Sequence, residues 1–366
     1  MTLTRHGLVL GKMYPPHVGH ELLVRTAATV SDHVTVLVLA HPCESLPVAQ
    51  RVRWLEDAVA DLSNVTVVGG VDPHPVDYDD PAIWDLHMEV FRAAVAQASA
   101  EPVSAVFTSE PYGEELARRF SATNVIVDAA RELAPVSSTK VRADVVGTWE
   151  LLPLAVRAGL AQRVVVVGSE STGTTSVSRG VVDALRRRGG AHGLTRWVPE
   201  FGRDRTLTLL AETRAVAALN GMRPATMDDI AWPTEEFVSI AVEQNRLEDE
   251  AARIGGPVLV CDTDAFATGI WHERYCGSRS TSVESLARHH PLYLVTHHDG
   301  VPFEQDGIRD GAHLRSWMTD RFLEALEATG REHVVLYGSL DERINHALRA
   351  IDDLLDRGWG FTDPIG

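Results

Sequence analysis

The length and charge of the chain limit what it can be. It has 366 residues, with 51 acidic and 34 basic side chains and a formal net charge of −17. At about 100 to 200 residues per domain, this length predicts two globular domains that each bury a core. The acidic balance excludes a protein that coats nucleic acid or an anionic membrane, because long-range attraction to phosphate needs a basic face. We therefore expect small molecules as partners, with no nucleic acid and no membrane among them.

The cysteines and the apolar stretches indicate in which cellular compartment the protein works. Cys43, Cys261 and Cys276 form no CxxC pair, which argues against a disulfide framework. No apolar run approaches the roughly 18 to 20 residues that span a bilayer. The N-terminal residues reach a strand-like run without an export signal. These features predict a cytoplasmic protein.

Short apolar runs separated by helical patterns fill the first half of the chain. The runs that predict buried strands are residues 7–10, 34–40, 65–68, 105–108 and 125–127. Helical periodicity occupies residues 21–29 and 50–61 between them. This alternation is typical of a doubly wound α/β sheet. A polar stretch over 135–144 and a helical segment over 147–159 follow it.

The same pattern restarts at Arg163. Further strands are predicted over residues 164–167, 258–261, 292–296 and 334–337, with helices over 234–253 and 312–328. The sequence therefore predicts two α/β domains, each a doubly wound parallel sheet. We expect the first to cover residues 1–147 and the second residues 162–366, with a linker segment over 148–161.

A glycine and two histidines follow the first predicted strand. The segment reads Gly11-Lys12-Met13-Tyr14-Pro15-Pro16-His17-Val18-Gly19-His20 and leads into a helix. A glycine at the end of a strand lets a ligand approach the backbone, and the next helix presents its N-terminal amides to an anion. His17 and His20 are three residues apart, so both imidazoles can point at one polyphosphate.

A second polar segment lies about 120 residues later. It reads Val136-Ser137-Ser138-Thr139-Lys140-Val141-Arg142. Hydroxyl groups and a guanidinium ahead of a helix suit phosphate oxygens, although the same residues can simply cap a helix.

Together the two segments resemble the paired GxFxPxHxGH and ISSTxxR signatures of the nucleotidyltransferase superfamily. Within it, GKMYPPHVGH and the later Ser109-Glu110-Pro111-Tyr112 resemble the nicotinamide mononucleotide adenylyltransferase module of the NadR family. The resemblance implies a Rossmann-like nucleotidyltransferase domain. It also implies that the mononucleotide's phosphate attacks ATP with Mg²⁺ as cofactor, giving NAD and pyrophosphate.

The resemblance assigns roles to residues of this first site. Lys12, His17, His20 and Arg142 would hold the ATP phosphates. The other residues of the ATP site would be Gly11, Met13, Ser137, Ser138 and Thr139. Trp84 precedes a predicted helix and is either a stacking partner for the nicotinamide ring or a core residue.

A phosphate loop opens the second half. The strand at 164–167 leads into Gly168-Ser169-Glu170-Ser171-Thr172-Gly173-Thr174-Thr175 and then a helix. This matches the GxxxxGK[ST] pattern, whose successive amides wrap the phosphates of ATP. Thr175 occupies the position of the hydroxyl that binds Mg²⁺.

Thr174 stands where that pattern has lysine. The lysine spans the β and γ phosphates, and losing one such preorganised group commonly lowers a rate by about 10² to 10³. Two interpretations stay open. Either another cation supplies the charge, or the domain binds nucleotide without catalysis.

Three later segments resemble the ribosylnicotinamide kinase half of the NadR family. They are VPEFGR at 198–203, VCDTD at 260–264 and PFEQDGIR at 302–309, which belongs to a closing lid in that family. The resemblance thus covers nearly the whole chain and implies a P-loop kinase as the second domain.

The acidic and basic residues of these segments suit a kinase site. Asp262 and Asp264 at a strand end can hold Mg²⁺, and one of them could accept the proton of the ribose 5′-hydroxyl. Glu200 and Arg203 could bind the ribose or the transferred phosphoryl group, and Arg309 or Arg203 could replace the missing lysine. Two further substrate-side candidates are Trp232, for ring stacking, and Asp306.

We therefore expect an enzyme of NAD salvage that uses ATP and Mg²⁺. Its second domain would phosphorylate nicotinamide riboside, and its first would convert the mononucleotide into NAD. Two alternatives remain: an adenylyltransferase with a non-catalytic nucleotide-sensing domain, and a regulatory protein that reports NAD or ATP levels. NadR proteins often begin with a helix-turn-helix domain, which we do not expect here because the first strand starts near Gly7. Nicotinamide or nicotinic acid as the base, and a monomer or a homo-oligomer, both stay open.

Overall fold

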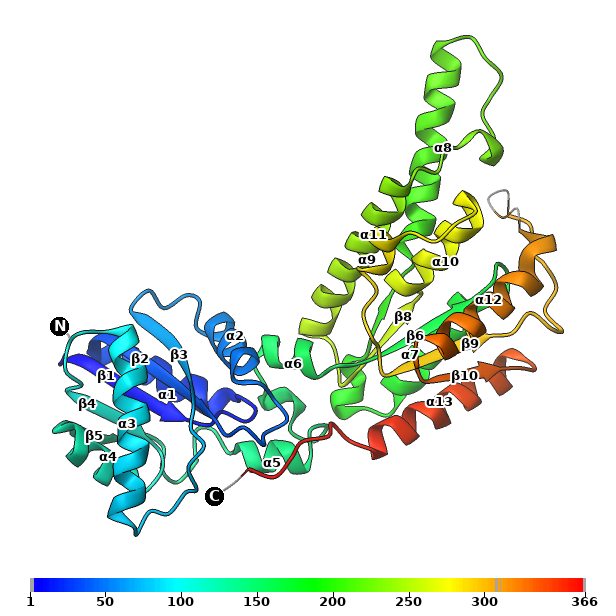
Figure 1. Cartoon of the computed structure of the whole chain (residues 1–366). Helices are drawn as coiled ribbons and strands as arrows, with labels where there is room; N and C mark the ends of the chain where they lie inside the picture. The colour runs from blue at the N-terminus through cyan, green and yellow to red at the C-terminus, as the bar shows by residue number, and fades with distance from the viewer. Residues whose placement is uncertain (1–2, 307–308, 310, 365–366) are drawn as a thin grey trace. The chain divides into compact units, whose positions relative to one another are not determined.

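The chain folds into two compact units, each built on one parallel sheet (Figure 1). The structure is a computed structural model that describes residues 3–306, 309 and 311–364. The first unit runs to Gly159 and includes the residues from Gly358 onward, and the second runs from Leu160 to Arg357. Each sheet has five strands, and all neighbouring strands pair in parallel. The predicted fold class is confirmed.

The first unit alternates strands and helices. Its strands are β1 (Thr4–Gly11), β2 (Ser31–Ala40), β3 (Val65–Val71), β4 (Ala105–Thr108) and β5 (Thr123–Ile126), in the sheet order β3-β2-β1-β4-β5. Its helices are α1 (Val18–Val30), α2 (Val48–Ala58), α3 (Pro81–Ala98), α4 (Gly113–Phe120), α5 (Ser138–Ala143), the 3-10 turn η1 (Trp149–Leu151) and α6 (Leu154–Leu160). The five strands predicted from apolar runs are all present.

The second unit repeats the plan. Its strands are β6 (Gln162–Gly168), β7 (Arg196–Val198), β8 (Val258–Asp262), β9 (Leu292–Thr296) and β10 (His333–Leu336), in the order β10-β9-β6-β8-β7. Its longer helices are α7 (Thr174–Arg187), α8 (Phe201–Leu219), α9 (Thr234–Ile254), α10 (Ala265–Cys276), α12 (Arg315–Ala328) and α13 (Leu340–Asp356). Its shorter ones are η2 (Gly190–Leu194), η3 (Met227–Asp229), α11 (Thr281–Glu284) and η4 (Ala312–Leu314). The short strand β7 and the helix α8 were not predicted from the sequence.

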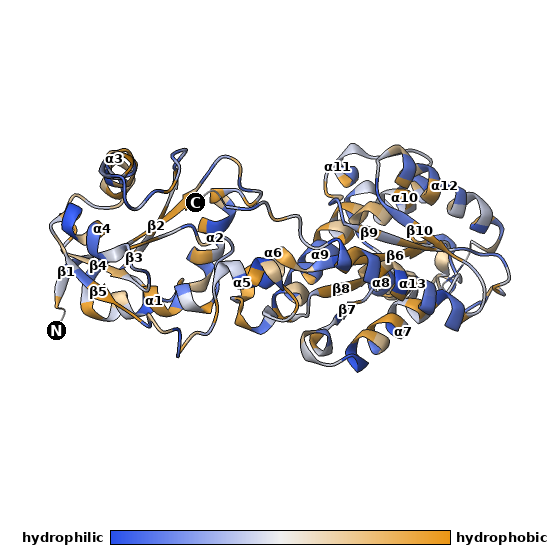
Figure 2. Ribbon diagram, turned by 90° about the horizontal axis from the view of Figure 1, so that it is seen from below, coloured by the Kyte–Doolittle hydropathy of each residue, from blue (hydrophilic) through white to orange (hydrophobic). Residues whose placement is uncertain are grey.

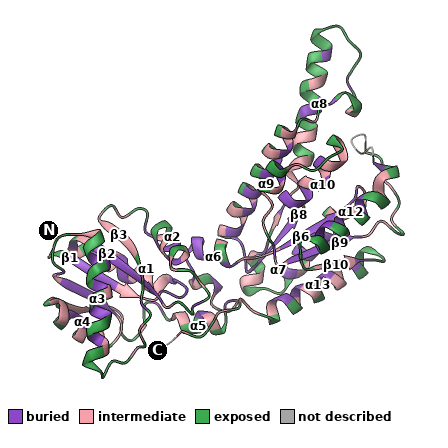
Figure 3. Ribbon diagram, in the orientation of Figure 1, coloured by how far each residue is buried: buried purple, intermediate pink, exposed green. Residues whose placement is uncertain are grey.

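The central strands of both sheets are buried on both faces, which explains why their sequences are continuous apolar runs. Leu8 and Val9 of β1 and Val164 to Val166 of β6 are fully buried. Figure 2 shows the strands in the colour of hydrophobic residues, and Figure 3 shows the same strands as buried. Among the residues that the structure describes, no helix is long and apolar enough to cross a membrane.

The boundary between the units differs in detail from the predicted linker over 148–161. Trp149 in that segment is fully buried, and the first unit extends to Gly159. A Cβ atom on Gly159 would lie only 2.2 Å from the Trp54 ring, so α6 packs closely on α2. Residues 148–159 of this segment are therefore part of the first unit.

The residues after α13 return to the first unit, which no sequence pattern predicted. The Thr362 hydroxyl donates to the Cys43 carbonyl at 2.9 Å and accepts from the Ser45 amide at 2.9 Å. The Thr362 carbonyl accepts from the Tyr14 hydroxyl at 3.0 Å, and the Phe361 ring packs edge-on against the Tyr14 ring. This segment therefore fixes Tyr14, which lies in the loop between β1 and α1.

A buried polar pair lies beneath the second sheet. Glu248 on α9 is fully buried, and its Oε2 atom lies 3.4 Å from Nε2 of His290. Burial, reinforced by the Asp264 charge, raises the pKa of Glu248 to about 8. Burial also lowers the pKa of His290 to about 3. Both groups are therefore neutral near pH 7.

The Glu248→Gln variant should gain stability over the natural chain as the pH rises. Glu248 ionises near pH 4.5, as an ordinary glutamate does, in the unfolded chain but only near pH 8 in the folded one, where burial raises its pKa. Rising pH therefore favours unfolding of the natural chain between these values. The difference in the free energy of unfolding between the two proteins should change in favour of the variant by up to about 1.4 kcal/mol per pH unit. Calorimetric unfolding of both proteins at pH 5, 6.5 and 8 measures it. If the difference between the unfolding temperatures of the two proteins is the same at all three pH values, the raised pKa of Glu248 is contradicted.

Candidate functional sites

The first site is a cavity of about 250 Å³ at the carboxyl end of β1. Lys12, His17, His20 and the residues Ser137 to Thr139 line it. The two sequence motifs, separated by more than a hundred residues, therefore meet at one cavity. The other predicted residues that line it are Gly11 and Met13.

The two histidines form the N-terminus of α1. Nδ1 of His17 accepts from the Gly19 amide at 3.1 Å, and Nδ1 of His20 accepts from the His17 amide at 3.2 Å. Their rings stack with centroids 3.8 Å apart. Because each Nδ1 is an acceptor, the proton of each neutral ring lies on Nε2. Each imidazole can therefore donate one hydrogen bond to an anion.

Burial keeps both imidazoles neutral. It is the main cause that lowers the pKa of His17 far below its ordinary value and the pKa of His20 to about 3. The charge of Arg131 lowers both further. Arg131 lines the cavity and donates to Glu110 at 2.5 Å. Arg131 belongs to neither sequence motif, so the sequence does not predict its place at this site.

Lys12 and Arg142 are both held at the edge of the site. Nζ of Lys12 lies 3.3 Å from the buried carboxylate of Glu44, which also pairs with Arg51 at 2.8 Å. Arg142 donates to the Tyr14 carbonyl at 2.6 Å and to the Thr139 hydroxyl at 3.2 Å. Arg142 does not line the cavity as the structure describes it, so its predicted phosphate contact needs a change of rotamer.

Trp84 is a core residue. Of the two roles that the sequence left open, ring stacking and core packing, the structure therefore favours core packing. Its side chain is 5% exposed within the core that α3 covers, and its Nε1 donates to the Tyr78 carbonyl at 3.0 Å. It is therefore not placed to stack on a ligand ring. Tyr78, which is 60% exposed, stacks on Tyr112 at 5.7 Å between ring centroids, and Tyr112 lines the cavity. Tyr78 is therefore an exposed aromatic side chain beside a residue of this cavity.

The second site is a cavity of about 640 Å³ where β6 and β8 end and α7 begins. The predicted loop lies along it, with Gly168, Glu170, Ser171, Thr174 and Thr175 in its wall. Gly173 adopts a φ of 87°, in the left-handed region that favours glycine. The loop geometry that the GxxxxG spacing predicts is therefore present.

Thr172 faces away from this cavity. It is buried, and its hydroxyl donates to the Ser169 carbonyl and contacts the Thr296 hydroxyl, each at 2.7 Å. The buried Arg343 donates to the Thr172 carbonyl at 3.0 Å. Thr172 thus stabilises the loop from the side opposite the cavity. Its side chain is not available to a ligand, so at this position the loop offers only its backbone.

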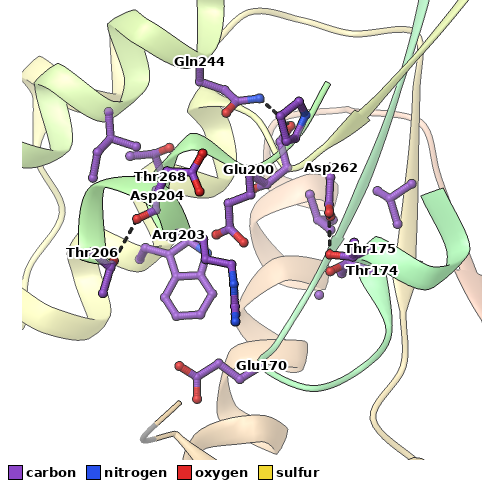
Figure 4. A pocket seen from close by; sticks show the side chains of 18 of the residues that line it. Glu170, Thr174, Thr175, Glu200, Arg203, Asp204, Thr206, Gln244, Asp262 and Thr268 are labelled. Carbon is purple, nitrogen blue, oxygen red and sulfur yellow. Dashed lines mark hydrogen bonds between the residues drawn. The ribbon is translucent and has the colours of Figure 1, made fainter. Parts of the chain in front are cut away.

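A hydroxyl and a carboxylate meet beneath the loop (Figure 4). The Thr175 hydroxyl donates to Oδ2 of Asp262 at 2.6 Å. Hard oxygen donors of this kind are those that Mg²⁺ prefers, so the pair fits such an ion. Burial raises the pKa of Asp262, and its hydrogen bond from Thr175 opposes the rise.

Asp264, predicted as a metal ligand, is not part of this site. It is fully buried, its Oδ1 accepts from the Ala267 amide at 2.9 Å, and its Oδ2 accepts from the Tyr293 hydroxyl at 2.8 Å. Thr263 has a φ of 70°, so the extended backbone ends directly after Asp262. The two aspartates therefore do not share a face, and Asp264 caps α10.

Glu200 and Arg203 face the cavity from the start of α8 (Figure 4). Burial, reinforced by the charge of Asp262, raises the pKa of Glu200 to about 7, and Arg203 opposes the rise. Arg203 pairs with Asp306 at 2.6 Å, and Arg309 lines the cavity while donating to the Glu304 carbonyl at 2.9 Å. The predicted residues Gly307 and Ile308 lie outside the described residues.

The remaining wall is aromatic. Trp232 lines the cavity, as predicted for a stacking residue, and stacks on Tyr275 with centroids 5.1 Å apart. Phe237 and Trp271 also line it. Trp271 and Tyr275 are four residues apart on α10, a spacing that would have placed them on one face had the helix been predicted.

Comparison with known proteins agrees with this division. A family model described as an AAA domain matches residues 163–343, and one described as the citrate lyase ligase C-terminal domain matches residues 7–73. The trifunctional NAD biosynthesis/regulator protein NadR of Salmonella typhimurium is 22% identical over 83% of this chain and 71% of its own length. The Escherichia coli protein of that name is 22% identical over 90% of this chain and 78% of its own length.

Solved NadR structures share the fold along nearly the whole chain. One, in complex with NR, has a TM-score of 0.65 and 19% identity, and the match covers 99% of both chains. Another, in complex with NAD and AMP-PNP, has a TM-score of 0.63 and 20% identity and covers 96% of this chain and 97% of its own. These matches show that the chain is similar to NadR proteins over most of its length and shares the two-domain fold of the solved NadR structures.

Proposed function

We propose that the chain is a bifunctional enzyme. Its first unit transfers the adenylyl group of ATP to nicotinamide mononucleotide, and its second phosphorylates nicotinamide riboside with ATP. The observation that carries this is the meeting of His17, His20 and the 137–139 segment at one cavity, with a second phosphate loop at an independent cavity. Relatives named for NAD biosynthesis, and related structures with NR or with NAD and AMP-PNP, support it.

In the first unit, the chemistry needs positioning and charge stabilisation more than a base. An oxygen of the mononucleotide's phosphate attacks the α-phosphorus of ATP, and the bond to pyrophosphate breaks. The Nε2–H groups of His17 and His20 are directed donors for oxygens whose negative charge grows in this step, and Lys12 supplies a full charge. Neutral imidazoles can fill this role, because each keeps one N–H donor at Nε2.

In the second unit, the ribose 5′-hydroxyl attacks the γ-phosphorus of ATP and ADP leaves. Thr175 and Asp262 would hold Mg²⁺, which would neutralise phosphate charge when bound. Glu200 is the candidate base in place of Asp262 or Asp264, because it opens into the cavity and its pKa is about 7. The hydroxyl proton would pass to the Glu200 carboxylate, and the aromatic wall around Trp232 would hold the base of the riboside.

Thr174 supports a second candidate function, in which the second unit binds nucleotide without catalysis. The retained Thr175–Asp262 contact and the Glu200 carboxyl group favour the kinase. A purely sensing domain would need no base with a pKa near neutrality, which Glu200 could supply here.

Separate variants test the two activities in one chain. His17→Asn removes the imidazole donor but keeps a side chain suited to the N-cap of α1, and Asp262→Asn removes the carboxylate beside Thr175. We expect His17→Asn to lower NAD formation from mononucleotide by about 10² to 10³, leaving riboside phosphorylation intact. Asp262→Asn should do the reverse. Chromatography of products with ATP and Mg²⁺ measures both.

Each unit thus serves as the folding control for the other. NAD formation that survives in His17→Asn would contradict the first assignment. A natural chain that makes NAD from the mononucleotide but leaves the riboside unchanged would establish the non-catalytic alternative.

Riboside phosphorylation should rise with pH through about 7 if Glu200 is the base. The carboxyl group accepts a proton only when ionised, and its pKa in the folded chain is about 7, so kcat/KM should fall about tenfold per unit at lower pH. Initial rates between pH 5.5 and 8.5, with NAD formation by the first unit followed in parallel, measure this. A flat profile with full activity at pH 5.5 would exclude Glu200 as the base.

A further inference from the structure

The second cavity has no lysine to complete its phosphate loop. The whole chain has only two lysines, Lys12 and Lys140, and both belong to the first unit. A permanently charged side chain of the second unit that replaces the missing charge at Thr174 must therefore be an arginine. The arginines that line the described cavity are Arg179, Arg203 and Arg309.

Two of these arginines are already paired with the acidic residues Glu304 and Asp306. Arg203 forms a 2.6 Å ion pair with Asp306. Arg309 lies 3.6 Å from the same carboxylate and 3.8 Å from that of Glu304. Their charge is thus already balanced by neighbouring acids, and reaching a phosphate would require breaking these pairs.

Arg179 is different, because it faces the cavity without an acidic partner. No carboxylate of the described residues lies within ion-pair distance of its guanidinium. Its guanidinium carbon lies 4.3 Å from the centre of the Trp197 ring, and Nε1 of Trp197 donates to the Ser178 hydroxyl at 2.9 Å. The ring is thus fixed by its own hydrogen bond and supports a cation that keeps its hydrogen-bond donors available.

The position of Arg179 on α7 directs it toward the phosphate end. It follows Thr175 by four residues, so the two side chains lie on one face of the helix. Side chains on a helix lean toward its N-terminus, which here is the phosphate loop. Its charge also opposes the burial that raises the pKa of Asp262, which places it in electrostatic range of the Thr175–Asp262 pair.

We propose that Arg179 takes the place of the P-loop lysine, binding the phosphoryl group of ATP as it passes from the donor to the acceptor. The proposal rests on the proposed kinase function. Lysine of the usual loop approaches this group from the loop itself, whereas Arg179 would approach from one helical turn further along α7, in the cavity that Glu200 and Asp262 also line. A guanidinium suits this role because it offers two parallel donors to two phosphate oxygens.

Substitution at Arg179 and Thr174 in the full chain tests the proposal. Arg179→Ala should lower kcat for riboside phosphorylation by about 10² to 10³, with a change in KM for the riboside of less than threefold. Thr174→Lys should restore much of the loss in the Arg179→Ala background but add little to the natural chain, because the two cations serve one group. Arg187→Ala, an exposed arginine near the end of the same helix, is the matched control and should leave kcat unchanged.

The outcomes separate this proposal from the function on which it rests. Full activity of Arg179→Ala in a phosphorylating enzyme would overturn the proposal and leave the kinase function standing. A natural chain without riboside phosphorylation that gains it on Thr174→Lys would overturn both the proposal and the natural kinase activity. NAD formation by the first unit confirms in each variant that the chain is folded.

Discussion

Phosphate must bind to this protein against its overall charge, and that constraint explains where the two sites lie. With a net charge of −17, the chain as a whole repels a nucleotide over a distance instead of attracting it. Attraction has to come from backbone amides at the start of a helix, which carry partial positive charge and are already oriented. α1 and α7 are the helices that begin directly after the central strands β1 and β6. Each sheet therefore contributes one such helix start, and each has a cavity beside it.

The few ionisable side chains at these turns are therefore held in specific protonation states or ion pairs. In the first cavity the buried His17 and the partly buried His20 stay neutral and can donate hydrogen bonds, while Lys12 is held by the buried Glu44. In the second, carboxylates outnumber guanidiniums: Glu170, Glu200, Asp204 and Asp262 against Arg179, Arg203 and Arg309. The raised pKa of Glu200 is a direct consequence of that acidic, buried setting. A nucleotide adds further negative charge, so a metal ion and an available arginine are needed there.

The sequence predicted the sheets and the two turns because these depend on local patterns. Continuous apolar runs mark strands buried on both faces, and GxxxxG and HxxH spacings are short-range features. What it could not predict depends on contacts between distant segments. Asp264 turns away because Thr263 leaves the extended conformation, and Trp84 enters the core because α3 packs on the sheet. Arg131, Tyr78 and Arg179 belong to no motif, and their roles follow only from the cavities that they line or approach.

The most direct test of two independent phosphate sites is the stoichiometry of AMP-PNP binding. Isothermal titration of the natural chain should give two molecules per chain. The value should fall to one in His17→Asn and to one in Thr175→Val, since each change removes the polar side chain of a different turn. A stoichiometry of one in the natural chain, or a single change that abolishes both binding events, would contradict the account.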